Sequence, residues 1–167
     1  MLKAYEVACF FLNKDKDRKI FTKNLEIRNN RCFWDGNAKL NKFLHLAQNI
    51  YIAKTGQPLF DDVLYAYDNG AVVPDVQEHY SQLLENHQKC PLDNISEETK
   101  KYLNKFFEAF KNATLDELIE LSHEDDAWKE KAQNYKKADQ KMNSLERVSE
   151  YKEQYADIIS ILDRMVC

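Results

Sequence analysis

The sequence predicts a mainly α-helical protein, a single compact domain over residues 1–167 with a small β-hairpin or short strands. Apolar residues recur at three- and four-residue intervals over most of the chain, which is the spacing of amphipathic helices. Only 3 Gly and 3 Pro occur among many Lys, Glu, Leu and Ala, a composition that favours helices over a β-sandwich or barrel. A chain of 167 residues fits one domain, and a hydrophobic fraction of 44% supplies its core.

The pattern of the N-terminal residues predicts one helix and one hairpin. Helical spacing of apolar residues covers 2–13, and a charged connector follows at 13–19. Around Asn29-Asn30 apolar residues alternate, and asparagine tolerates a positive φ, so 24–35 is expected to form a hairpin with a two-residue turn. Arg28 and Arg31 would then face each other, and their repulsion counts against the hairpin.

The central part predicts a long helix over 37–55, because its apolar stripe is broad and regular. Gly56 supplies a left-handed residue at the helix end, and Pro58 prevents the helix from continuing. A short strand is expected over 63–67, followed by a turn at 68–70. Pro74 suits the first position of the next helix, which we expect over 74–87.

The C-terminal part predicts three further helices and a weaker segment. Ser96 opens a helix with an aromatic face, and Thr114 with Glu117 forms a capping box for the next one. An acidic break at 123–126 precedes a short helical piece, and 132–143 is expected to be a loop or a weak helix. Asn143, paired with Glu146, is expected to cap a last helix that reaches at least residue 162.

Charge and cysteine content exclude several classes of protein. A formal charge of −4 and a pI near 5.6 argue against a protein that coats DNA or RNA, so we expect no nucleic-acid partner. No apolar run reaches the roughly 20 residues of a membrane helix, and the N-terminus lacks the features of a signal peptide. Cys9, Cys32, Cys90 and Cys167 form no CxxC pair, so neither a zinc site nor a redox motif is indicated, and a reducing cytoplasm is expected.

No catalytic motif is evident. The chain lacks a G-x-S-x-G elbow and a glycine-rich phosphate loop, and its histidines at 45, 79, 87 and 123 lie on predicted helices or their ends, where we interpret them as structural. The acidic runs 61–62 and 124–126 fit solvated ends or helix caps better than a metal site. We therefore expect no catalytic residue, metal ligand or cofactor. Trp128 fits either a partner anchor or a core residue, and we favour the core.

Three segments, Leu40–Asp62, Tyr65–Tyr80 and Leu118–Lys131, resemble in order and spacing the signature blocks of the Panacea domain, the SocA-like family also labelled phage-associated protein or GepA. The resemblance spans about residues 1–132, with 133–167 as a C-terminal helical extension and 24–35 as an insertion. Tyr67 stands where the family usually has Trp, Ala71 where it often has Pro, and Ser122 where it often has Thr.

The resemblance implies an antitoxin-like role: a bacterial or prophage protein of the cytoplasm that neutralises a cognate toxin by direct binding, without being an enzyme. In the SocA branch the family member also delivers its toxin to a ClpXP-type protease. The residues that we expect to contact the partner are Tyr67, Asp68, Asn69, Gly70, Pro74, His123, Asp126 and Trp128.

Two alternatives stay open at this point. One is a phage-associated structural or regulatory interaction protein. The other is a metal-dependent hydrolase or nuclease that uses His123 and nearby carboxylates. The sequence leaves the identity of the toxin and the oligomeric state open.

Overall fold

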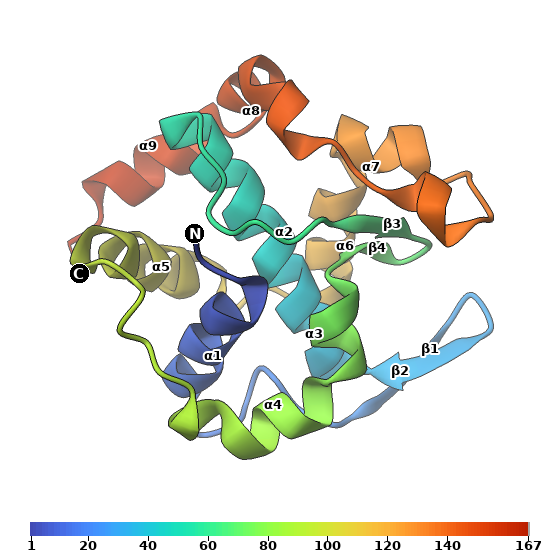
Figure 1. Ribbon diagram of the computed structural model, residues 1–167, viewed down its shortest axis with the longest axis horizontal. Coiled ribbons are helices and arrows are strands. Elements are labelled where there is room, and N and C mark those ends of the chain that lie inside the picture. The colour runs from blue at the N-terminus through green and yellow to red at the C-terminus, as the bar shows by residue number, and fades with distance from the viewer. Residues whose placement is uncertain (167) are drawn as a thin grey trace.

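Helix α2 (Asp35–Thr55) runs through the centre of the structure, and the other elements surround it (Figure 1). This computed structural model describes residues 1–166. The predicted fold class is confirmed, because the described chain is mainly helical with two small antiparallel sheets of two strands each. The strands are β1 (Leu25–Arg28), β2 (Arg31–Trp34), β3 (Tyr65–Tyr67) and β4 (Gly70–Val72). The remaining α-helices are α1 (Ala4–Lys14), α3 (Pro74–Glu78), α4 (Tyr80–Asn86), α5 (Glu97–Phe110), α6 (Leu115–His123), α7 (Asp126–Lys131), α8 (Val148–Gln154) and α9 (Ala156–Arg164).

An aromatic cluster joins α1, α2 and α5 on one side of the core. The Phe43 ring lies 5.4 Å from Phe11 and 5.6 Å from Phe106, measured between ring centroids, with edge-to-face geometry. All three side chains are fully buried. Such pairs stabilise the packing beyond the apolar area that they bury. No helix in residues 1–166 has the length and apolar character to cross a membrane.

The local signals in the sequence are confirmed where they depend on near neighbours. Gly56 ends α2 with a φ of 73°, and the Ser96 side chain accepts a hydrogen bond from the Thr99 N–H at the start of α5. Thr114 and Glu117 form the reciprocal capping box of α6. These groups satisfy backbone donors and acceptors that a helix end leaves free.

The hairpin is also confirmed, and Asn29 and Asn30 take φ values of 51° and 61° in its turn. Arg28 and Arg31 are opposite each other, as expected. Their repulsion is relieved because each guanidinium has its own carboxylate: Arg28 bonds Asp116 of α6, and Arg31 pairs with Asp68.

Two predicted helices are interrupted. The helix expected over 74–87 breaks at His79 and continues as α4 and the 3₁₀ turn η1 (His87–Lys89). The last helix breaks at Tyr155, and it follows a 3₁₀ turn, η3 (Ser144–Arg147), for which the Asn143 side chain makes no cap. A tyrosine is buried at each break, Tyr80 and Tyr155, so tertiary packing overrides the helical periodicity there. The weak segment at 132–143 contains the 3₁₀ turn η2 (Lys137–Gln140).

Candidate functional site

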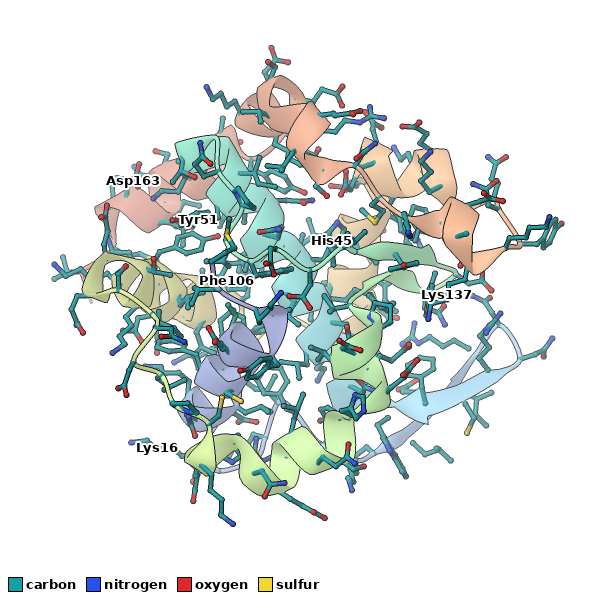
Figure 2. All side chains as sticks on the ribbon, in the orientation of Figure 1. Lys16, His45, Tyr51, Phe106, Lys137 and Asp163 are labelled. Atoms are coloured by element: carbon teal, nitrogen blue, oxygen red, sulfur yellow. The ribbon has the colours of Figure 1, made fainter. Side chains whose placement is uncertain are left out.

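A cavity of about 590 Å³ lies between the β1–β2 hairpin, the first half of α2, the β3–β4 turn and η2. We call it the hairpin cavity. Figure 2 shows Lys137 at the side of the molecule where the hairpin and the β3–β4 turn approach each other. Its wall includes Arg31, Phe33, Lys42, Tyr67, Asp68 and Lys137.

The β3–β4 turn favours glycine at its last position. Gly70 is buried with a φ of 111°, a conformation that side chains rarely adopt. A Cβ at this position would lie 2.4 Å from Lys42 Cε and 2.8 Å from Ser122 Oγ. The turn therefore rests directly on side chains of α2 and α6.

Trp128 bonds the same turn through its indole N–H, and His123 stacks on Trp128. The Trp128 Nε1–H donates to the Tyr67 carbonyl at 2.8 Å, and the His123 ring stacks on the indole with centroids 4.0 Å apart. Burial lowers the pKa of His123, and its Nε2 has no hydrogen-bond partner in the described chain. The expectation that Trp128 packs on the core and finds an acceptor is confirmed.

Six of the eight residues expected to contact a partner thus come together: Tyr67, Asp68, Asn69, Gly70, His123 and Trp128. The other two lie apart. Pro74 begins α3 and lines a separate cavity of about 290 Å³, and Asp126 is exposed at the start of α7.

The tip of the β1–β2 hairpin is hydrogen-bonded to the β3–β4 turn, and the apolar face of the hairpin is exposed to solvent. Asn29 Nδ2 donates to Asn69 Oδ1 at 2.9 Å, which adds to the two arginine ion pairs. On the opposite face, Leu25 is 60% exposed and Ile27 is 71% exposed. This arrangement reverses the usual burial of an apolar strand face, and exposed apolar patches mark interaction sites.

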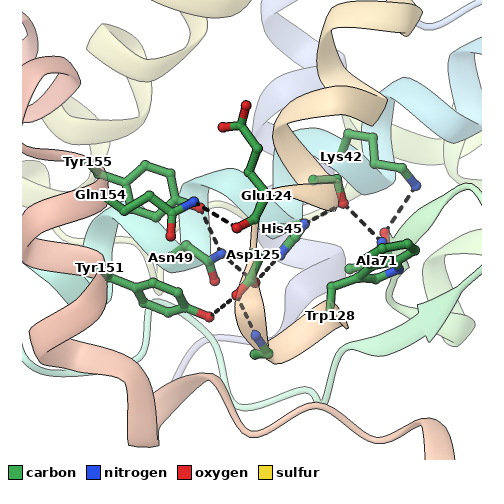
Figure 3. A network of polar contacts seen from close by, with 12 residues as sticks. Lys42, His45, Asn49, Ala71, Glu124, Asp125, Trp128, Tyr151, Gln154 and Tyr155 are labelled. Carbon is green, nitrogen blue, oxygen red and sulfur yellow. Dashed lines mark hydrogen bonds and ion pairs between the residues drawn. The ribbon is translucent and has the colours of Figure 1, made fainter. Parts of the chain in front are cut away.

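Behind the turn, a buried polar network centres on Asp125 (Figure 3). Its carboxylate accepts hydrogen bonds from His45 Nε2 at 2.6 Å, Asn49 Nδ2 at 2.8 Å, the Tyr151 hydroxyl at 2.7 Å and the Ala127 N–H at 2.9 Å. Burial alone would raise the pKa of Asp125, but the hydrogen bonds from His45, Asn49 and Tyr151 hold it below its ordinary value. The network therefore contains a buried carboxylate with four donors around it.

Three buried side chains are connected like a hydrolytic triad: the serine (Ser122) contacts the histidine (His45), and the histidine contacts the aspartate (Asp125). Ser122 Oγ lies 2.8 Å from His45 Nδ1, and it also accepts the Ala71 N–H at 3.1 Å. All three side chains have no exposed surface. A substrate cannot reach Ser122 in this arrangement, so the contacts hold α2, α6 and β4 together instead of presenting a nucleophile.

Lys42 is a buried lysine in the wall of the hairpin cavity. It is 1% exposed, and its Nζ donates to the Ala71 carbonyl at 3.1 Å. Burial lowers the pKa of this amine to about 7, and no ion pair in residues 1–166 opposes the shift. A lysine in such a place is costly to keep charged, because it lacks a carboxylate partner.

The sequence interpretation missed several members of the cavity wall, namely Lys42, Arg31 and Lys137. Lys42 lies between apolar residues of the predicted 37–55 helix, so its position on the buried face was a signal available in the sequence. For Arg31 and Lys137 no such signal exists, because they approach the turn only through tertiary packing.

Comparison with known proteins gives one match. The family model described as "Antitoxin SocA-like, Panacea domain" matches residues 40–129, which is more than half of the chain. The matched span includes most of α2, the β3–β4 turn and α6, and it ends just after Trp128. Neither the curated proteins nor the solved structures include a match to this chain.

We expect Asp125→Asn to lower the free energy of unfolding by about 3–5 kcal/mol, because the amide would place an N–H against donors that now face a carboxylate. The matched control is Asp126→Asn, whose exposed side chain makes only an ion pair with Lys129 and should cost less than about 1 kcal/mol. Urea unfolding of both variants measures the difference, and equal losses would contradict the role given to Asp125.

The buried lysine predicts a pH-dependent stability. The unfolded chain holds the Lys42 proton up to a pH of about 10.4, whereas the folded chain releases it near pH 7. The unfolded state therefore binds more protons between these values, and raising the pH stabilises the fold. Relative to Lys42→Met, the wild-type free energy of unfolding should rise by up to about 4 kcal/mol from pH 7 to pH 10. A difference that stays constant over this range would refute the buried amine.

Gly70→Ala should destabilise the fold by about 2–5 kcal/mol, because strain at positive φ adds to a clash with Lys42 and Ser122. Gly56→Ala is the control, since it also has a positive φ but nothing within 4 Å of the added Cβ, and it should cost only about 1–2 kcal/mol. Thermal unfolding of the two variants measures the difference, to which the clash and the larger φ of Gly70 both contribute.

Proposed function

The chain belongs to the SocA-like antitoxin family, the Panacea domain, and on this premise we propose that it is an antitoxin-like protein that neutralises a cognate toxin by binding it directly. The family match carries this proposal. The matched span contains the β3–β4 turn and the residues that support it, so the proposed site lies inside the part of the chain that defines the family.

The proposed binding surface combines the β3–β4 turn, the hairpin cavity and the outward face of the hairpin. The turn is exposed at Asp68 but rigidly supported at Gly70. On the outward face of the hairpin, Leu25 and Ile27 present apolar area to solvent. Exposed apolar area beside a well-supported polar turn suits recognition of another protein. Below this surface, Trp128 and His123 hold the β3–β4 turn in place.

The proposed activity is binding and not catalysis. The three side chains that are arranged like a hydrolytic triad are fully buried, and they hold elements of the core together. We place the protein in the cytoplasm, because Cys9, Cys32 and Cys90 carry free thiols, which suits a reducing compartment.

Co-expression with the protein encoded next to this chain tests the proposal. If that protein is toxic alone, growth should recover when this chain is present, and the two proteins should co-purify. Recovery accompanied by loss of the toxin in cells that contain ClpXP, but not in cells that lack it, would indicate the protease-adaptor version of the family role. Absence of both recovery and co-purification would contradict the antitoxin proposal.

A surface substitution should separate binding from folding. Ile27→Asp, on the outward hairpin face, should weaken toxin binding at least tenfold while leaving the melting temperature nearly unchanged, because Ile27 is 71% exposed. Ile161→Asp is the control, because this isoleucine is 47% exposed and belongs to α9, which lies on the side of the molecule away from the hairpin (Figure 1). Equal binding by the two variants would remove the hairpin face from the proposed surface.

A further inference from the structure

We propose that the hairpin cavity receives an acidic segment of the partner protein, whose Asp or Glu carboxylates lie against Lys42, Arg31 and Lys137. This inference rests on the proposed function, since the partner is the toxin, and it adds the chemistry by which the partner is recognised. Three observations support it: the charge of the cavity wall, the free bonding capacity of Lys42, and the size and borders of the cavity.

The wall of the cavity is cationic on an acidic protein. It contains three basic side chains, Arg31, Lys42 and Lys137, and one acidic side chain, Asp68, so its formal charge is 3 − 1 = +2 when Lys42 is protonated. The whole chain has a formal charge of −4. A partner segment with carboxylates is therefore attracted to this cavity and repelled by much of the remaining surface.

Lys42 has bonding capacity that the protein does not use. A protonated lysine offers three N–H donors, and in residues 1–166 its Nζ makes one hydrogen bond, to the Ala71 carbonyl. Only burial shifts its pKa, so no carboxylate of the described chain lies close enough to stabilise its charge. Lys42 is only 1% exposed, but unlike Ser122 it lines the cavity, so a carboxylate that enters the cavity would supply the missing acceptor and the missing negative charge.

The size and borders of the cavity favour a protein segment over a free ion. A volume of about 590 Å³ exceeds what one carboxylate needs and lies within the range of ligand pockets, about 300–1,000 Å³. Tyr135 stands at the border with its side chain fully exposed. Cys32 lines the cavity and is paired across the hairpin with Ile27 of the apolar face. Because Ile27 lies on the outward face of the hairpin, a partner segment contacts apolar and cationic groups together only if it passes over the edge of the hairpin.

Peptide titration tests the inference directly. The probe is an acetylated and amidated peptide with three consecutive Glu residues, compared with the same peptide containing Gln, and added to the full ¹⁵N-labelled chain. We expect the Glu peptide to shift the amide signals of Asn69 and Gly70 and to bind at least tenfold more tightly than the Gln peptide. Equal binding of the two peptides, shifts located elsewhere or absence of binding would overturn the inference.

Matched variants identify the cavity as the binding site. Arg31→Gln combined with Lys137→Gln should weaken binding of the Glu peptide at least tenfold, and both side chains are exposed, so the fold should persist. Lys101→Gln, an exposed position on α5 away from the cavity, should have no effect. If sodium acetate at the same carboxylate concentration reproduces the shifts, the cavity selects small anions and the partner-segment inference is wrong.

The two proposals can fail separately. If the Arg31 and Lys137 double variant still neutralises the co-expressed toxin and co-purifies with it as well as the wild type, the inference about the acidic segment fails while the antitoxin proposal stands. If the Glu peptide binds as expected but the neighbouring protein is neither bound nor neutralised, the antitoxin proposal fails while the cavity keeps its assigned chemistry.

Discussion

One buried carboxylate determines how the centre of this protein is arranged. Asp125 is fully buried, and a charge in that position is tolerated only when hydrogen bonds replace the lost water. Its donors come from separate elements: His45 and Asn49 on α2, Tyr151 on α8 and Ala127 on α7. Displacing any of these elements would leave part of the charge without a donor, so the carboxylate fixes their relative positions.

The same constraint extends from the core to the surface turn. His45 contacts Asp125 on one side and Ser122 on the other, and Ser122 Oγ accepts the Ala71 N–H. The Ala71 carbonyl accepts from Lys42, so side chains satisfy both backbone groups of this β4 residue. Gly70 packs directly on Lys42 and Ser122. The turn is therefore held by this packing and by the bonds to Ala71, and its exposed side chains need no hydrogen bond to the core. The position of the turn thus follows from the buried network.

The sequence predicted those features that depend on residues a few positions apart. Gly56, the Asn29–Asn30 turn and the Thr114 capping box all require only local chemistry, and all three are confirmed. The acidic break at 123–126 was recognised, but no local rule shows which of its carboxylates is buried. That choice depends on His45, which is 80 positions from Asp125. The break at Tyr155 was missed for the same reason, since Asn49 donates to its hydroxyl from 106 positions away.

The residues of the candidate site fall partly inside and partly outside the span matched by the family model. Lys42, Asp68 and Gly70 lie within the span matched by the family model, and resemblance to that family pointed to the turn. Arg31 and Lys137 lie outside that span, on the hairpin and on η2, and neither followed from the family pattern. The buried lysine and the turn are thus set by the core, whereas the exposed cations on either side of it lie outside the matched span. A partner that contacts both sets would be recognised by the exposed charges as well as by the buried amine, because removal of Arg31 and Lys137 would leave Lys42 without flanking cations.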